Sequence, residues 1–218
     1  MAKQFQRELE KIKKSILSLG AMVEDRVRLA IKSIEKRDAD MAEQIIRMDY
    51  EIDEMEVDIE EECIKVLALH QPVAVDLRFL VSVIKINNDL ERIADETVNI
   101  AHRVKTISKN RDIKFIFDYT TMAEKASAML KMSLDAMVRL DTDTAFKVCL
   151  MDDDVDIFVG QAYEQLKQSI RATSGNTGVL INMFLVSRHI ERIADHATNI
   201  AEEVIYVTDG EIVRHGKF

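Results

Sequence analysis

The chain repeats itself, and this repetition limits its folding more than any other feature. The segment ERIADETVNIA at residues 91–101 returns as ERIADHATNIA at residues 191–201, with eight of eleven positions identical. Farther upstream, each half also has a turn-and-cap signal, Asp38-Ala39-Asp40 in the first and Asp141-Thr142-Asp143 in the second. A self-similar chain of this kind is expected to fold as two like units packed together.

Composition and chain breaks predict helices throughout. The 218 residues include six Gly, one Pro and no Trp, and only 6% are aromatic, which favours helix over strand. Breaks fall at 70–72 and 174–176, and the polar segment 108–111 separates the halves. Helices this long need bundle partners, either as two packed three-helix bundles or as one six-helix bundle. The prediction is an all-α fold of two tandem three-helix bundle repeats, residues 1–108 and residues 109–218 with a short C-terminal tail, with helices at about 4–37, 39–69, 74–107, 112–139, 142–173 and 177–208.

Each repeat carries two acid pairs whose members are four residues apart. The pairs are Asp49/Asp53, Glu91/Asp95, Asp152/Asp156 and Glu191/Asp195. On a helical wheel, Glu91 and Asp95 lie within an apolar stripe, and a second apolar stripe covers another side of the same helix. The solvated face of that helix is expected to hold the remaining polar residues, Lys85, Asp89, Arg92, Glu96 and Arg103.

Carboxylates at this spacing repel each other. Their Cβ atoms lie about 6 Å apart on a helix, and the repulsion is roughly 3 kcal/mol at an effective dielectric near 20. Cations, arginines, protonation or exposure must offset it. If the two acid-bearing helices of a repeat face each other, four carboxylates converge, and oxygen-rich sites suit Mg, Mn, Ca, Fe or Zn. Glu56 and Glu60 extend the column in the first repeat, whereas Val159 and Tyr163 occupy the matching positions in the second, so their role stays open.

Two other interpretations of the acids remain open. Arg92 and Arg192 each stand three residues before Asp95 and Asp195, so the acids could form surface salt bridges in a purely structural helical adaptor. Alternatively, the acids could serve a metal-dependent oxidase or hydrolase. Against the enzyme, no acid is followed three residues later by His, the pattern of di-iron bundles, and no nucleotide-binding or hydrolase motif is present. We therefore predict a non-enzymatic protein.

Charge and hydropathy exclude several partners and compartments. A net charge of -9 and a pI near 5.1 argue against nucleic acid, which requires a basic face. The longest apolar stretches, 79–86 and 179–186, are too short to span a bilayer, and the N-terminus lacks a signal-peptide core. Cys63 and Cys149 are isolated thiols, typical of buried residues in a reducing compartment. A cytoplasmic location is expected.

The motifs of the chain resemble those of the PhoU family. The resemblance rests on EECIKVLALHQP, DLRFLVSVIKINNDLERIADETVNIA, IERIADHATNIAEEVIY and DGEIVRH, which cover both halves in the family's order and spacing. One departure is Ala94 and Ala194, where the family often has Gly.

The resemblance implies a cytoplasmic regulator of phosphate uptake built from two three-helix repeats. Such proteins link the phosphate ABC importer to a sensor histidine kinase and keep the starvation response off when phosphate is ample; some members are homodimers. Several hold multinuclear metal sites at [ED]xxxD motifs. Carried over, these motifs predict metal ligands at Asp49, Asp53, Glu91, Asp95, Asp152, Asp156, Glu191 and Asp195, for iron, zinc, magnesium or manganese. Contact with the membrane is expected only through the importer and the kinase.

Overall fold

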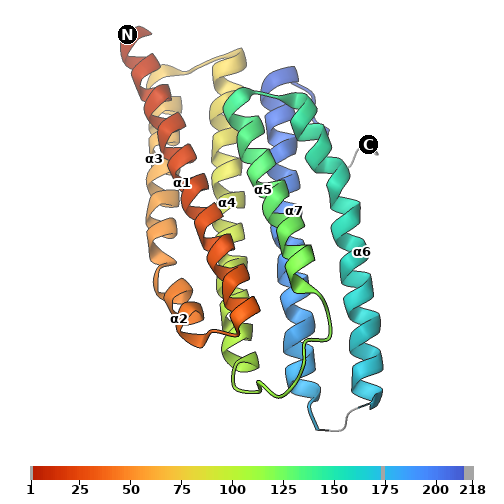
Figure 1. The fold of residues 1–218 in the computed structure, drawn as a ribbon. Helices are drawn as coiled ribbons and strands as arrows, with labels where there is room; N and C mark the ends of the chain where they lie inside the picture. Colours follow the sequence, from red (N-terminus) through yellow and green to blue (C-terminus); the bar gives the residue numbers. More distant parts are fainter. Residues whose placement is uncertain (1, 173–174, 214–218) are drawn as a thin grey trace.

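The computed structural model describes residues 2–172 and 175–213, and within these ranges the regular structure is entirely helical (Figure 1). This confirms the all-α prediction. The helices are α1 (Ala2–Lys36), α2 (Ala39–Arg47), α3 (Tyr50–His70), α4 (Ala74–Ile107), α5 (Tyr119–Arg139), α6 (Thr142–Ala172) and α7 (Thr177–Asp209).

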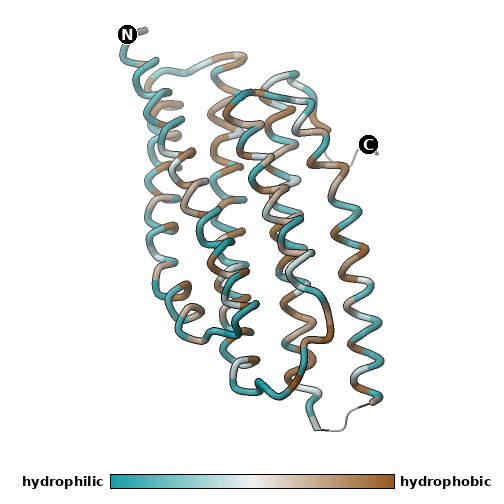
Figure 2. Tube along the Cα trace, in the orientation of Figure 1, coloured by the Kyte–Doolittle hydropathy of each residue, from teal (hydrophilic) through white to brown (hydrophobic). Residues whose placement is uncertain are grey.

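The two halves share one core. In Figure 1, α3 and α6 form opposite edges of the molecule, and α1, α4, α5 and α7 lie between them. Apolar residues recur along every helix (Figure 2). The apolar residues on the inner faces of the helices form a single buried cluster that includes residues of both halves, for example Leu19, Leu90, Leu130 and Ile190. The closest association joins α4 to α7, one helix from each repeat. The repeats are therefore packed over a common core, and neither has a separate one.

The predicted helix at 39–69 is interrupted at Met48 and Asp49, so that prediction was wrong in one respect. Met48 has φ -97° and ψ 3°, and α3 starts again with Asp49 as its N-cap. The buried Arg26 of α1 donates to the Met48 carbonyl at 3.4 Å and to the Glu51 carboxylate at 2.6 Å. The Met48 carbonyl therefore accepts from a side chain of another helix as well as from the Glu51 N–H at 3.4 Å, which stabilises the break. The matching helix of the second repeat, α6, is continuous.

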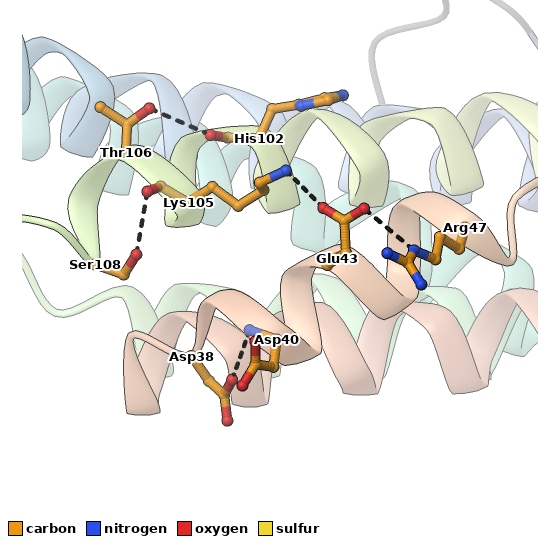
Figure 3. A network of polar contacts seen from close by, with 8 residues as sticks. All are labelled: Asp38, Asp40, Glu43, Arg47, His102, Lys105, Thr106 and Ser108. Atoms are coloured by element: carbon orange, nitrogen blue, oxygen red, sulfur yellow. Dashed lines mark hydrogen bonds and ion pairs between the residues drawn. The ribbon is translucent and has the colours of Figure 1, made fainter.

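The short helix α2 is fixed at both ends (Figure 3). At its start the Asp38 side chain accepts from the backbone N–H groups of Asp40 and Met41, both at 3.0 Å. Nearer its end, Glu43 accepts from Lys105 of α4 at 2.6 Å and from Arg47 at 3.2 Å. These contacts hold α2 against α4.

The predicted start of the helix at 112–139 was also wrong, because α5 begins only at Tyr119. Asp118 caps this helix, accepting from the Thr121 N–H at 3.3 Å. The preceding residues turn inward instead of continuing as a helix, and the Phe117 ring contacts Tyr119 and Phe158 at centroid distances of 5.6 and 6.1 Å. This aromatic cluster closes one end of the core.

The other helices follow the prediction closely. The expected helix at 74–107 is α4, and those at 142–173 and 177–208 correspond to α6 and α7. Residue 173 of the helix predicted at 142–173, residue 174 of the predicted break and residues 214–218 of the predicted tail lie outside the described residues. Cys63 and Cys149 are buried and unpaired, as expected. None of the described helices combines the length and the apolar character that crossing a membrane requires.

A row of polar side chains runs between α4 and α7, which we term the polar seam. Asp89 accepts from His196 at 2.8 Å, and Glu96 contacts His189 at 2.6 Å. At the two ends, Ser82 donates to Glu203 at 2.9 Å and Arg103 donates to Asn182 at 3.4 Å. The eight residues recur every seventh position on two antiparallel helices: Ser82, Asp89, Glu96 and Arg103 on α4, and Asn182, His189, His196 and Glu203 on α7.

The polar seam corrects the prediction of a solvated face on α4. The side chains of Glu96 and Asp89 are only 6% and 15% exposed, because α7 covers them. Burial alone would raise the pKa of Glu96, but the hydrogen bond and charge of His189, with the charge of Arg192, outweigh it and lower that pKa. Of the five residues assigned to that face, Arg92 stays mostly in water, with 58% of its side chain exposed.

Candidate metal centres

The first acidic cluster consists of Asp49, Asp53, Glu91 and Asp95. Asp49 precedes α3 as its N-cap and Asp53 lies in its first turn, where the positive end of the helix dipole favours negative charge. Burial, together with the charges of Asp53 and Asp95 and against that of Arg26, raises the pKa of Asp49 to about 6. The structure therefore brings the α3 pair into the electrostatic range of the α4 pair, as the prediction required.

On the α4 side of this cluster, Glu91 is the acid whose pKa is raised most. Burial raises the pKa of Glu91 to about 7, helped by the charges of Asp95, Asp53 and Glu56 and opposed by Arg92. The pKa of Asp95 is raised by burial and by Asp53, and its carboxyl group is hydrogen-bonded to that of Glu91. Glu56 thus belongs to the electrostatic surroundings of the first cluster, a point that the sequence left open.

The second acidic cluster consists of Asp152 and Asp156 on α6 with Glu191 and Asp195 on α7. Burial raises the pKa of Asp195 to about 6, with Asp152 and Asp156 adding to the effect. Glu191 likewise has a pKa raised to about 6 by burial, against the opposing charge of Arg188, with Asp195 and Asp156 adding to the increase. Both repeats therefore build the same arrangement from the same sequence positions.

The sequence did not reveal which acids the nearby arginines and Thr198 contact. The alternative of Arg92–Asp95 and Arg192–Asp195 salt bridges is not what the structure has: Arg92 lies 3.8 Å from Glu91, and Arg192 crosses the polar seam to Glu96 at 3.1 Å. Arg188, three residues before Glu191, approaches it to 2.6 Å, a spacing that the sequence could have revealed. Thr198 donates to Asp152 at 3.2 Å, which depends on how α6 packs against α7.

The chemistry of the clusters fits hard cations. Four carboxylates in each cluster supply only oxygen donors. Burial first, and neighbouring acids second, raise the pKa values of Asp49, Glu91 and Asp95 in the first cluster and of Asp152, Glu191 and Asp195 in the second. Among the described residues, however, no three His, Cys, Asp or Glu side chains already converge in an arrangement for holding a metal ion.

Comparison with known proteins gives the same architecture. The fold defines a class of all-α proteins with two helical repeats over one core, each presenting a carboxylate cluster at matching positions. The PhoU domain family matches residues 16–104 and again residues 119–204. The chain therefore belongs to the PhoU family, as its motifs predicted. The exact division at residues 108 and 109 stays a prediction.

Individual relatives cover nearly the whole chain. A phosphate-specific transport system accessory protein PhoU homolog from Clostridium acetobutylicum is 35% identical over 96% of this chain and 96% of its own length. The crystal structure of PhoU from Pseudomonas aeruginosa has a TM-score of 0.90 and 34% identity, covering 95% of this chain and all of that one.

A second solved structure, the phosphate transport system regulatory protein PhoU from Streptococcus pneumoniae, has a TM-score of 0.86 and 28% identity, covering 96% of this chain and 99% of that one. These relatives are named accessory and regulatory proteins. Membership of this family confirms the prediction that the chain is not an enzyme.

Proposed function

We propose that this protein is a cytoplasmic accessory regulator of phosphate transport that links the phosphate ABC importer to a sensor histidine kinase. The accessory and regulatory roles in the names of its relatives support the coarse function. The duplicated carboxylate cluster supports the metal-binding part of the proposal. Five of its eight acids are buried or partly buried, namely Asp49, Glu91, Asp95, Asp152 and Glu191, and a protein that needed these positions only for stability would not place acids there in both repeats.

The metal-binding part of the proposal assigns all eight acids as ligands, four in each repeat. A bound di- or trivalent cation, of iron, zinc, magnesium or manganese, would neutralise the clusters. The chain's own residues would hold the ion through carboxylate oxygens, while Thr198 would orient Asp152 and Arg188 would orient Glu191. The neutralised faces would then be available to a kinase or importer subunit, in a monomer or a homodimer.

Elemental analysis tests the metal sites. The variant Asp95→Asn/Asp195→Asn should lose bound metal after purification with each candidate ion. The matched control is Glu54→Gln/Asp153→Asn, which removes one exposed acid from each repeat outside the clusters and should keep the wild-type metal content. Full metal content in the cluster variant, or none in the wild type, would overturn the assignment in favour of a structural adaptor.

In cells, a phosphate-starvation reporter should stay on in phosphate-rich medium when the cluster variant replaces the wild type.

A further inference from the structure

The outer face of α3 carries an apolar stripe that faces away from the core. Tyr50, Val57 and Ile64 are 58%, 50% and 54% exposed and recur every seventh residue. Two residues after each of them comes a buried core position, Ile52, Ile59 and Val66. Since two residues turn a helix by about 200°, the stripe lies on the side opposite the core. In Figure 1, α3 forms an edge of the molecule, and its neighbours are α1 and α4.

The same face is strongly acidic. Eight of the 21 residues of α3 are Asp or Glu and one is Lys, so this one helix contributes -7 to a chain whose net charge is -9. Glu54 and Glu61 fall between the stripe residues and are exposed. In the described part of the chain, ion pairs on α3 engage Glu51 and Glu62, whereas Glu54 and Glu61 have none.

We propose that this outer face of α3, which we term the α3 stripe, binds an amphipathic helix of a partner that carries Lys or Arg beside its apolar positions. A helix that packs along another uses apolar positions about every 3.5 residues. The α3 stripe supplies one apolar position in each seven, and exposed acids such as Glu54 and Glu61 stand between them, so its partner needs basic residues beside its apolar ones. The stripe from Tyr50 to Ile64 is about 21 Å long at 1.5 Å per residue, which matches four turns of a partner helix. Basic residues on that partner would meet Glu54 and Glu61 at the edges of the contact.

A second copy of this chain does not fit the α3 stripe. Two α3 helices side by side would bring two strongly acidic faces together, and like charges across an interface are unfavourable. The most basic helix of the protein is α1, with nine Lys and Arg against five acids, but α1 exposes no large apolar side chain in its described residues; α5 exposes Val138 but carries only one more base than acids. The occupant with both a basic and an apolar face therefore belongs to another protein.

A peptide-binding experiment on the full chain tests this proposal. The probe is a fluorescent 21-residue helical peptide with Leu at the seven-residue seam and Lys or Arg flanking it. Its control has the same composition in scrambled order. In 0.15 M salt the amphipathic peptide should bind at least tenfold more tightly than the scrambled one. Val57→Ser/Ile64→Ser should weaken binding at least tenfold, and Glu54→Gln/Glu61→Gln should weaken it severalfold.

The opposite edge of the molecule provides a matched control. Leu150 and Ile157 of α6 are each 59% exposed, and Leu150→Ser/Ile157→Ser should leave binding within twofold of wild type. Equal binding of the scrambled peptide, or equal losses in the α3 and α6 variants, would overturn the proposal. A wild-type dimer that Val57→Ser/Ile64→Ser converts to a monomer would also overturn it, because the occupant would then be a second copy.

This inference rests on the proposed function, since an accessory protein acts through a partner, but the two can fail separately. Val57→Ser/Ile64→Ser should keep full metal content by elemental analysis, because neither residue belongs to an acidic cluster. Loss of metal in that variant would contradict the separation of the stripe from the metal site. Peptide binding with no metal in the wild type would contradict the metal sites and leave the stripe supported.

Discussion

Single carboxyl groups set the pH behaviour of this protein. The pKa of Glu91 is about 7, and those of Asp49, Glu191 and Asp195 are about 6. All four pKa values lie above the ordinary carboxyl value of about 4. Between about pH 4 and these raised pKa values, the folded chain therefore binds more protons than the unfolded chain. Stability then falls as pH rises.

We accordingly expect metal-free protein to lose stability between about pH 5 and pH 7.5. The loss should be about 1–3 kcal/mol in total after allowance for solvent screening, measured by urea unfolding in chelator. Glu91→Gln/Glu191→Gln should flatten this dependence, because the amides do not titrate. A stability that rises over the same pH range would show that the clusters are not under the repulsion described.

The positions of the acid pairs could be predicted from the sequence, but the burial of Glu96 could not. The four acid pairs could be placed because their spacing and the apolar residues beside them are local properties. The burial of Glu96 could not, because it depends on His189, which is 93 residues away in the chain. The partner of Arg192 could not be predicted for the same reason, since Arg192 reaches across to Glu96 of the other repeat.

Among the helices, the contact of α4 with α7 is the element that joins the repeats. At one end of the polar seam, Glu203 is only 4% exposed at its side chain and lies 3.0 Å from Lys85, whose side chain is 39% exposed. Ser82 also donates to Glu203 at 2.9 Å. A buried carboxylate that loses its cation is costly, whereas a neutral pair of similar shape is not.

Lys85→Met should therefore lower the free energy of unfolding by about 1–3 kcal/mol, less than for a fully buried pair because Lys85 is partly exposed. The double variant Lys85→Met/Glu203→Gln should recover part of that loss. Urea unfolding at constant pH measures both. Additive losses in the double variant would mean that the two side chains do not stabilise each other.

Helix boundaries were predicted correctly where local sequence determines them, and not where contacts with other helices are involved. Helix α4 ends as predicted because polar residues follow it directly. At the break, the Met48 carbonyl is bonded to Arg26 of another helix. Before α5, Phe117 packs on Phe158 of α6. Both deviations involve tertiary contacts that no local pattern contains.

The whole molecule should unfold as one unit, because both repeats contribute to one core. Leu90 of α4 is fully buried within that core. Leu90→Ala should lower stability by about 2–5 kcal/mol and should shift a single calorimetric transition without dividing it. Two transitions, only one of which moves, would show that the repeats unfold independently. The duplication in the sequence predicted two like units, but it could not reveal that they share a core.

The polar seam also shows that the two repeats differ at matching positions. Asp89 corresponds to His189 and Glu96 to His196 when the repeats are superimposed on their matching motifs. In this register, two copies of the first repeat would set Asp89 against Glu96, and two copies of the second would set histidine against histidine. Only unlike repeats place an acid opposite a histidine. Each half is therefore selective for the other, so that an α4–α7 contact between two chains would keep its acid–histidine pairs only if the chains exchanged a whole repeat.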